Sequence, residues 1–124
     1  MKQLFLFSLL CILPLLVNGQ AKFLAVNPTH EFQDTKEGEL LTHYYTVKNI
    51  GNAPLIISDY KVACSCTKIE LPSQPILPGS EVKLKMTFDT KGKYNWQDRT
   101  IVLTTNTKKK QEKLRFKVFV ISAE

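Results

Sequence analysis

Residues 81–88 have the sequence Glu-Val-Lys-Leu-Lys-Met-Thr-Phe, in which polar and apolar side chains alternate without a break. Successive side chains of a β-strand point to opposite faces of a sheet, so this alternation predicts a strand with one buried face and one solvated face. Further strands are predicted where the same or a related pattern recurs, in residues 23–26, 41–48, 55–62, 100–104 and 114–121. No segment has the spacing of an amphipathic helix, so we expect an all-β protein.

Turn residues separate these predicted strands. Residues 49–54 (Asn-Ile-Gly-Asn-Ala-Pro) and 77–80 (Leu-Pro-Gly-Ser) contain residue types that favour tight turns. Three prolines in residues 72–78 predict an irregular crossing between sheets, because proline cannot serve in a central strand. About seven short strands in so small a chain predict an immunoglobulin-like antiparallel β-sandwich, with a small barrel as the alternative.

The N-terminus has the pattern of an export signal. A positively charged start is followed by an apolar run over residues 4–17, and Gly19 supplies a small residue for cleavage before Gln20. The run is shorter than the roughly 18 apolar residues of a spanning helix, although an uncleaved anchor is the alternative. We therefore predict a signal peptide over residues 1–19 and a single domain over residues 20–124. After cleavage no membrane span is expected, and the domain would occupy the periplasm, the cell surface or the medium.

The chain is basic, with 17 Lys and Arg against 11 Asp and Glu and a formal net charge of +6. A basic surface attracts nucleic acid, anionic glycans or lipid headgroups. Export argues against nucleic acid as a partner. We expect a solvated charged surface that keeps the domain soluble, with an envelope or extracellular protein or surface as the partner.

Short motifs also follow one another in a specific order along the chain. They are Glu-Gly-Glu (37–39), Tyr-Thr-Val-Lys-Asn-Ile-Gly (45–51), Ala-Pro-Leu-Ile-Ile (53–57), Cys-Ser-Cys-Thr (64–67), Pro-Ile-Leu-Pro-Gly (75–79), Phe-Asp-Thr (88–90) and Thr-Asn (105–106). This ordered set resembles DUF 1573, a family of secreted bacterial domains of unknown function, over about residues 23–120. The resemblance implies an immunoglobulin-like sandwich, of the broad kind that includes the major-sperm-protein and cilium-associated modules. It also implies a location outside the cytoplasm, but no established activity. Glycine is usual or common in the family where this chain has Ser65, Asn95 and Val118.

Cys64 and Cys66 are the only cysteines outside the predicted signal, because Cys11 lies within it. In a regular strand such residues are about 6.6 Å apart, whereas the Cβ atoms of a disulfide are about 3.5–4.5 Å apart, so a bond requires the chain to curl. So short a loop would add only about 1.6 kcal/mol of stability, which suits a working disulfide better than a structural link. The alternatives are a pair of thiolates that binds Cu(I), two small buried side chains or a local link, and a bond to another chain.

Other residues give weaker indications of a site. A zinc site would need further ligands, and His30 and His43 are the only histidines. His43 falls on the apolar face of its strand, where we expect a hydrogen-bonded core histidine. Neither a phosphate-binding glycine loop nor a calcium loop is present in the sequence, and no signature of nucleophilic catalysis is evident.

Tyr94, Trp96 and Arg99 form a candidate binding surface, and the alternative is that the aromatic rings close the end of the sandwich. We therefore expect a non-enzymatic module without a cofactor, which binds its partner through an exposed sheet edge or the loop ends. The alternative is a thiol-based function, either disulfide exchange or Cu(I) binding, through Cys64 and Cys66.

Overall fold

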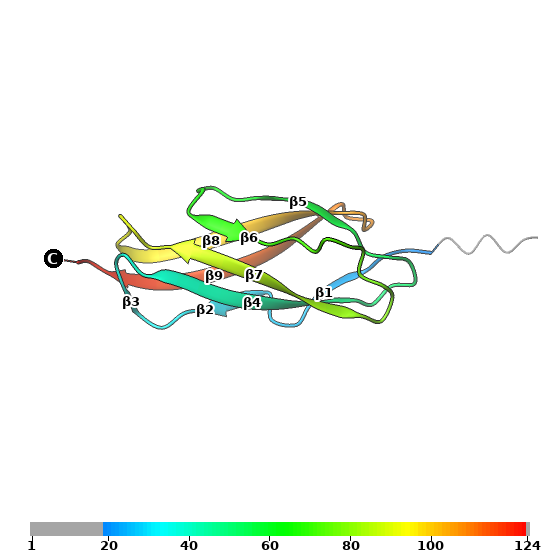
Figure 1. Cartoon of the computed structure of the whole chain (residues 1–124), viewed down its shortest axis with the longest axis horizontal. Helices are drawn as coiled ribbons and strands as arrows, with labels where there is room; N and C mark the ends of the chain where they lie inside the picture. The colour runs from blue at the N-terminus through cyan, green and yellow to red at the C-terminus, as the bar shows by residue number, and fades with distance from the viewer. Residues whose placement is uncertain (1–18, 124) are drawn as a thin grey trace, which may run out of the picture.

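The computed structural model describes residues 19–123, which fold into two β-sheets packed face to face (Figure 1). All regular structure in these residues is β-strand. The strands are, in chain order, β1 (Phe23–Ala25), β2 (Thr29–Glu31), β3 (Thr35–Lys36), β4 (Leu40–Asn49), β5 (Ile57–Lys61), β6 (Thr67–Ile69), β7 (Glu81–Asp89), β8 (Asn95–Thr105) and β9 (Gln111–Ile121). The predicted signal peptide lies outside the described residues, apart from Gly19.

The two sheets have the strand orders β1-β4-β7-β6 and β2-β9-β8-β5, and β3 also pairs with β9. The long central pairs, β4 with β7 and β8 with β9, are antiparallel. The short strands β2 and β3 pair with β9 in parallel, so the second sheet is mixed. The predicted immunoglobulin-like sandwich is confirmed, with these two parallel strands as an addition to its antiparallel framework.

The structure has more strands than the sequence pattern predicts. The additional strands β2, β3 and β6 contain only two or three residues each, which is too short for an alternating pattern to be visible. Strand β8 begins at Asn95 instead of Thr100. The alternating pattern does not predict its first half, because the half-buried positions there carry Gln97 and Arg99 in place of apolar side chains.

The core is formed by the inward side chains of the long strands. In β7, Leu84, Met86 and Phe88 are at most 1% exposed, as their alternation predicts. The buried Tyr45 of β4 also links the two sheets, because its hydroxyl donates a hydrogen bond of 2.8 Å to the carbonyl oxygen of Arg115 in β9. Burial raises the pKa of the Tyr45 phenol well above its ordinary value.

Asn49, at the end of β4, is a fully buried polar side chain with all of its hydrogen-bonding capacity used. Its Nδ2 donates to the carbonyl oxygens of Ala53 at 2.8 Å and Ile76 at 2.9 Å. Its Oδ1 accepts from the backbone amides of Gly51 at 3.0 Å and Lys22 at 3.3 Å. One side chain therefore holds together three segments that are far apart in the sequence.

Gly51 lies beneath the segment that leads into β1. A Cβ atom at this position would overlap the backbone of residues 20–22, including the carbonyl oxygen of Gln20. The same segment is paired with residues 50–52, because the amide of Asn52 donates to the carbonyl oxygen of Gln20 at 3.0 Å. Glycine is thus required here by close backbone approach.

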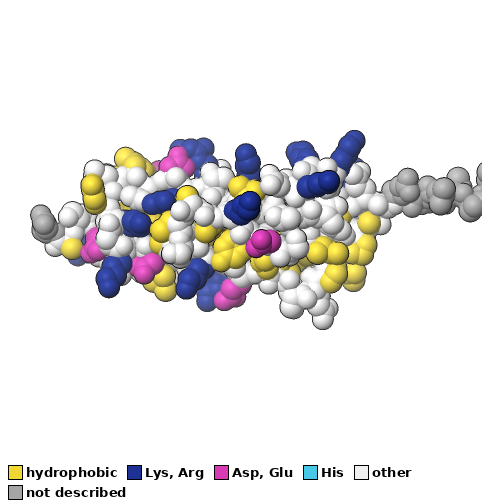
Figure 2. All heavy atoms as spheres, turned by 90° about the horizontal axis from the view of Figure 1, so that it is seen from above, with side chains coloured by type: hydrophobic (Ala, Val, Ile, Leu, Met, Phe, Trp, Pro, Cys, Tyr) yellow, Lys and Arg dark blue, Asp and Glu magenta, His cyan; other side chains and the backbone are white. Residues whose placement is uncertain are grey.

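Lys and Arg side chains are spread along the face shown in Figure 2, with acidic side chains between them. Within residues 19–123 the side-chain ion pairs are Lys48 with Glu81 and Arg115 with Asp98. No helix in the part of the chain that the structure describes is long and apolar enough to cross a membrane.

Candidate functional site

The two cysteines lie in the turn between β5 and β6 and are bonded to each other. The chain curls at this point, because the amide of Thr67 donates to the carbonyl oxygen of Cys64 at 3.1 Å. The Cα atoms of Cys64 and Cys66 are 5.1 Å apart, which is within the usual range for a disulfide. A disulfide between these cysteines is expected only if the chain curls here, and the chain does curl. Among the described residues, the non-glycine residues with positive φ are Asn95 and Lys110 and not Ser65. The backbone at position 65 therefore does not require the glycine that the family resemblance leads us to expect.

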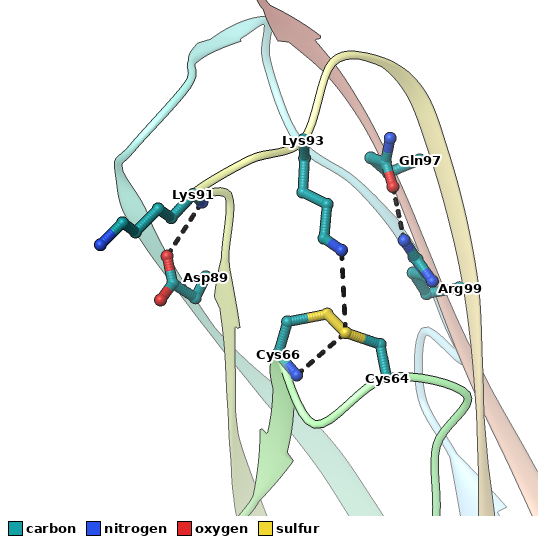
Figure 3. The surroundings of a disulfide bond; sticks show 7 residues. All are labelled: Cys64, Cys66, Asp89, Lys91, Lys93, Gln97 and Arg99. Atoms are coloured by element: carbon teal, nitrogen blue, oxygen red, sulfur yellow. Dashed lines mark hydrogen bonds between the residues drawn. A yellow bond between two sulfur atoms is a disulfide. The ribbon is translucent and has the colours of Figure 1, made fainter.

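The surroundings of the disulfide differ at its two ends (Figure 3). The Sγ atom of Cys64 lies 3.1 Å from the backbone nitrogen of Cys66 and 3.8 Å from the Nζ atom of Lys93, and both groups donate to it. Lys93 comes from the turn between β7 and β8, where its amide donates to the carbonyl oxygen of Thr90 at 2.9 Å. Cys66 instead packs against the hydrophobic core. The sulfur of Cys64 thus lies against two hydrogen-bond donors, whereas Cys66 packs on apolar side chains and also lines an open hollow.

An open hollow of about 380 Å³ lies beside the disulfide. It is lined by both cysteines and by neighbours that include Leu40, Lys68 and Asp89. Both cysteines are half-buried, and Leu40 is 65% exposed at the rim. The disulfide can therefore be approached from solvent on this side.

The candidate binding surface is assembled only in part. Tyr94 is 66% exposed in the turn before β8, and Trp96 is 61% exposed on the outward face of the second sheet. Trp96 lies directly opposite Phe119 of β9, and their rings meet edge to face with centroids 5.5 Å apart. We call the Trp96–Phe119 pair the aromatic platform. Trp96 thus lies on the outer face of a sheet and does not cover the end of the sandwich.

Arg99 does not belong to this platform. Its guanidinium lies 5.7 Å from the centroid of the buried Phe88 ring, and its Nη2 donates to Oε1 of Gln97 at 2.6 Å. Residues an odd number of positions apart on a strand face opposite sides of the sheet. Trp96 and Arg99 therefore lie on opposite faces of β8, and the group of three residues that the sequence suggests is not assembled on one face.

The two histidines meet at one edge of the sandwich. His30 of β2 and His43 of β4 stack with ring centroids 3.7 Å apart and planes inclined by 10°. His43 is partly buried on the inward face of its strand, as expected, but its ring contacts are with other rings, including Tyr45 at 4.7 Å. Burial lowers the pKa of both imidazoles, and the charge of His30 lowers that of His43 further.

The comparison with known families concerns nearly the whole domain. Residues 23–120 match the family described as protein of unknown function, DUF1573. The chain belongs to the DUF1573 family. No curated protein matches the sequence. The resemblance that the ordered motifs indicate is therefore confirmed, and the family itself assigns no activity.

Solved structures place this DUF1573 domain within a wider group of β-sandwiches. It is similar to a protein of unknown function from Porphyromonas gingivalis W83, with a TM-score of 0.67 and 15% identity over 82% of this chain and 46% of that one. The chain thus spans about half the length of that protein. It is also similar to the ASH / PapD-like domain 7 of human CEP192, with a TM-score of 0.64 and 14% identity over 85% of this chain and 89% of that one. A third likeness, to the VesB protease of Vibrio cholerae, has a TM-score of 0.59 and 8% identity, and covers 82% of this chain and 32% of the protease. At these identities the likeness concerns the fold alone.

The backbone conformation accounts for the residue type at position 95. Asn95 has a φ of 64°, in the left-handed region that glycine enters most easily and that asparagine tolerates better than most residues. The family resemblance leads us to expect glycine at this position, and asparagine meets the same backbone requirement. Asn95 thereby sets the direction in which the chain enters β8, two residues after Lys93 and one before Trp96.

Three contacts in these sites do not follow from the sequence pattern. Lys93 lies 29 positions from Cys64, and only the approach of two turns brings them together. Phe119 was predicted as part of a strand but not as the partner of Trp96, because this pairing depends on the register of β8 and β9. His30 lies on a strand too short to be predicted. In residues 19–123, no group of three or more His, Cys, Asp or Glu side chains is arranged to hold a metal ion.

Proposed function

We propose that this DUF1573 domain is a non-enzymatic binding module of the cell envelope, which engages an envelope or extracellular protein through the aromatic platform and Tyr94. The exposure of two large aromatic side chains, Tyr94 at 66% and Trp96 at 61%, carries the proposal. Aromatic side chains are enriched in protein interfaces, where Trp and Tyr contribute much of the binding energy. A tryptophan that already packs on Phe119 also loses little conformational freedom on binding.

The surroundings of the platform support a protein partner. Asp98 and Arg115 lie next to it on the outward face and form an ion pair, with Arg115 Nε donating to Asp98 at 2.7 Å. Lys117 stands opposite Asp98 in the register of β8 and β9. An apolar centre with a charged rim is the usual anatomy of a protein interface. The excess of Lys and Arg over Asp and Glu favours a partner whose surface is acidic.

The proposed location rests on two features. The apolar run at residues 4–17 and Gly19 predict an exported chain. The Cys64–Cys66 bond supports an oxidising compartment, because disulfides persist outside the cytosol. Periplasm, cell surface and medium are the proposed locations, and nucleic acid is not a proposed partner.

Photo-crosslinking benzoylphenylalanine, which keeps an aromatic side chain at position 96, tests the binding role in the producing cells. The matched control is the same amino acid at Tyr44, which is 53% exposed on the outer face of the other sheet. We expect one discrete crosslinked protein from position 96, none from position 44, and loss of the product from position 96 when Tyr94→Ala is added. Equal patterns from the two positions would contradict the proposal.

The second candidate is a thiol-based function, disulfide exchange or Cu(I) binding, and a specific observation favours it. Lys93 lies 3.8 Å from the sulfur of Cys64, where a cation would stabilise a thiolate once the bond is reduced. A Cys64→Ser/Cys66→Ser variant separates the two candidates. Crosslinking from position 96 should persist in this variant if binding is the function, and it should disappear if the interaction depends on the thiols.

A further inference from the structure

We propose that the Cys64–Cys66 bond exchanges with cysteine thiols of a partner protein, and that Cys64 is the sulfur released as a thiolate. This inference goes beyond the binding role and rests on the second candidate function. It is carried by the contrast between the two sulfurs, since donors surround Cys64 whereas Cys66 packs on the core. The sequence alone gives no reason to distinguish the two cysteines.

The direction of bond cleavage is argued from leaving-group stability. When a thiolate attacks a disulfide, the sulfur that best bears negative charge leaves most readily. The amide of Cys66, at 3.1 Å, and the Lys93 ammonium, at 3.8 Å, both point to the sulfur of Cys64. Negative charge that develops there is therefore stabilised at once, without movement of either donor. The incoming thiolate accordingly attacks Cys66.

The other charged groups around the disulfide support this assignment. Lys68 and Asp89 line the hollow beside the disulfide, so one positive and one negative charge face the approaching thiolate. Asp89 is already engaged, because its Oδ1 accepts from the amide of Lys91 at 3.0 Å. In Figure 3 the side chain of Lys91 points away from the disulfide, whereas that of Lys93 points toward it.

Arg99 of β8 is a further charged group near the disulfide (Figure 3). Its guanidinium is engaged elsewhere, because Nη2 donates a hydrogen bond of 2.6 Å to Oε1 of Gln97. Lys93 is therefore the charged group that is hydrogen-bonded to the sulfur.

The exchange balances in two steps. A partner thiolate attacks Sγ of Cys66, a new sulfur–sulfur bond forms, and the electron pair of the broken bond leaves on Cys64. A second thiolate of the partner then attacks its own sulfur in the mixed disulfide and releases Cys66. The partner dithiol is oxidised by two electrons to a disulfide, Cys64 and Cys66 are reduced, and the two protons pass to these thiolates or to solvent.

The experiment compares Lys93→Met with Lys91→Met, which removes a charge from the same turn without removing a contact to the sulfur. The reduced protein is alkylated with iodoacetamide over a range of pH, and tandem mass spectrometry locates the label. We expect Cys64 to react at lower pH than Cys66 in the wild type and in Lys91→Met. This preference should be clearly smaller in Lys93→Met, where only the amide of Cys66 still donates to the Cys64 sulfur. Lys93→Arg, which keeps a cation at this position, should retain the preference for Cys64.

Reduction of the intact disulfide by dithiothreitol supplies a second readout. Lys93→Met should slow it roughly two- to fivefold, and Lys91→Met should leave the rate unchanged. Preferential alkylation of Cys66, or equal behaviour of the two methionine variants, would overturn the assignment of Cys64. Because neither assay uses a partner, these outcomes are independent of the crosslinking test. The crosslink from position 96 could disappear in Cys64→Ser/Cys66→Ser while Lys93→Met has no effect in either assay. That result would support a thiol function but reject the assignment of Cys64 as the released sulfur.

Discussion

His30 and His43 stack face to face with their ring centroids 3.7 Å apart, although they belong to opposite sheets of the sandwich. The pair sits against Phe32, whose ring meets His30 edge to face at 4.5 Å. It joins the short strand β2 to the long strand β4. Because both rings can be protonated, we expect the contact between the sheets at this edge to depend on pH.

The first prediction concerns this pH dependence. The pKa of both histidines is lowered in the folded protein from an ordinary value of 6.5, chiefly by burial. As the pH falls, the unfolded chain binds protons before the folded chain does, so folding becomes less favourable. Stability should be fully present above the ordinary value and should be lost as the pH falls through the lowered pKa values. Urea unfolding at about pH 7.5 and about pH 5.5 measures this loss, because carboxylates titrate mainly below that range.

A His30→Asn/His43→Asn variant is the control for that measurement. It should be less stable than the wild type at neutral pH, because the stacked rings are gone. Its urea midpoint should change much less between the two pH values. An equal decrease in both proteins would assign the pH dependence to other groups.

The second prediction concerns Asn49. Truncation to alanine removes four hydrogen bonds from a fully buried position. The amides of Lys22 and Gly51 and the carbonyl of Ala53 lose the bond to this side chain, whereas the carbonyl of Ile76 still accepts from the amide of Leu55. Unpaired buried polar groups are expensive, so Asn49→Ala should lower the free energy of unfolding by about 2–4 kcal/mol. The control Asn52→Ala removes an exposed acceptor, and its cost should stay below about 1 kcal/mol. Similar losses for the two variants, measured by urea denaturation, would refute the central role of Asn49.

The third prediction concerns the left-handed backbone at Asn95, whose φ is 64°. Asn95→Gly should be neutral or stabilising, because glycine adopts this conformation without steric cost. Asn95→Ala should lower stability by about 1 kcal/mol, because a Cβ without a polar group disfavours it. Thermal unfolding of the two variants measures the difference. Equal midpoints would mean that the chain relaxes to another conformation at this position.

The fourth prediction concerns the disulfide as a structural element. The bond closes a loop between cysteines only two positions apart. By the chain-entropy estimate, Cys64→Ser/Cys66→Ser should cost no more than about 1.6 kcal/mol of stability. The variant should therefore fold and retain the urea dependence of its unfolding free energy. A loss above about 3 kcal/mol would identify the bond as a structural staple and weaken the case for exchange.

Much of the fold could be predicted from local patterns. The alternation in residues 81–88 defined both faces of β7, and the same logic placed Tyr45 and Phe116 in the core, where both are at most 1% exposed. The ordered motifs indicated the family, and the match over residues 23–120 confirmed it. These features depend on side-chain periodicity and turn chemistry, which are properties of neighbouring residues in the chain.

Less of the candidate site could be predicted from local patterns in the sequence. Cys64, Cys66, Tyr94 and Trp96 could be selected because cysteine pairs and exposed aromatic clusters are uncommon. Arg99 was grouped with Trp96 by proximity in sequence, but Asn95 to Thr105 form a single strand, so the two side chains point in opposite directions. The start of that strand was not predicted, because its inward positions there are polar.

The sequence by itself determined which residues face the core and where the chain turns, since both follow from interactions over a few positions. The tertiary structure alone decided that Lys93 lies beside Cys64, that Phe119 supports Trp96 and that His30 stacks on His43. Each of these contacts depends on the register of strand pairs and on the packing of one sheet against the other. Register and packing are set by the sum of many distant contacts, and no local pattern in the chain encodes that sum.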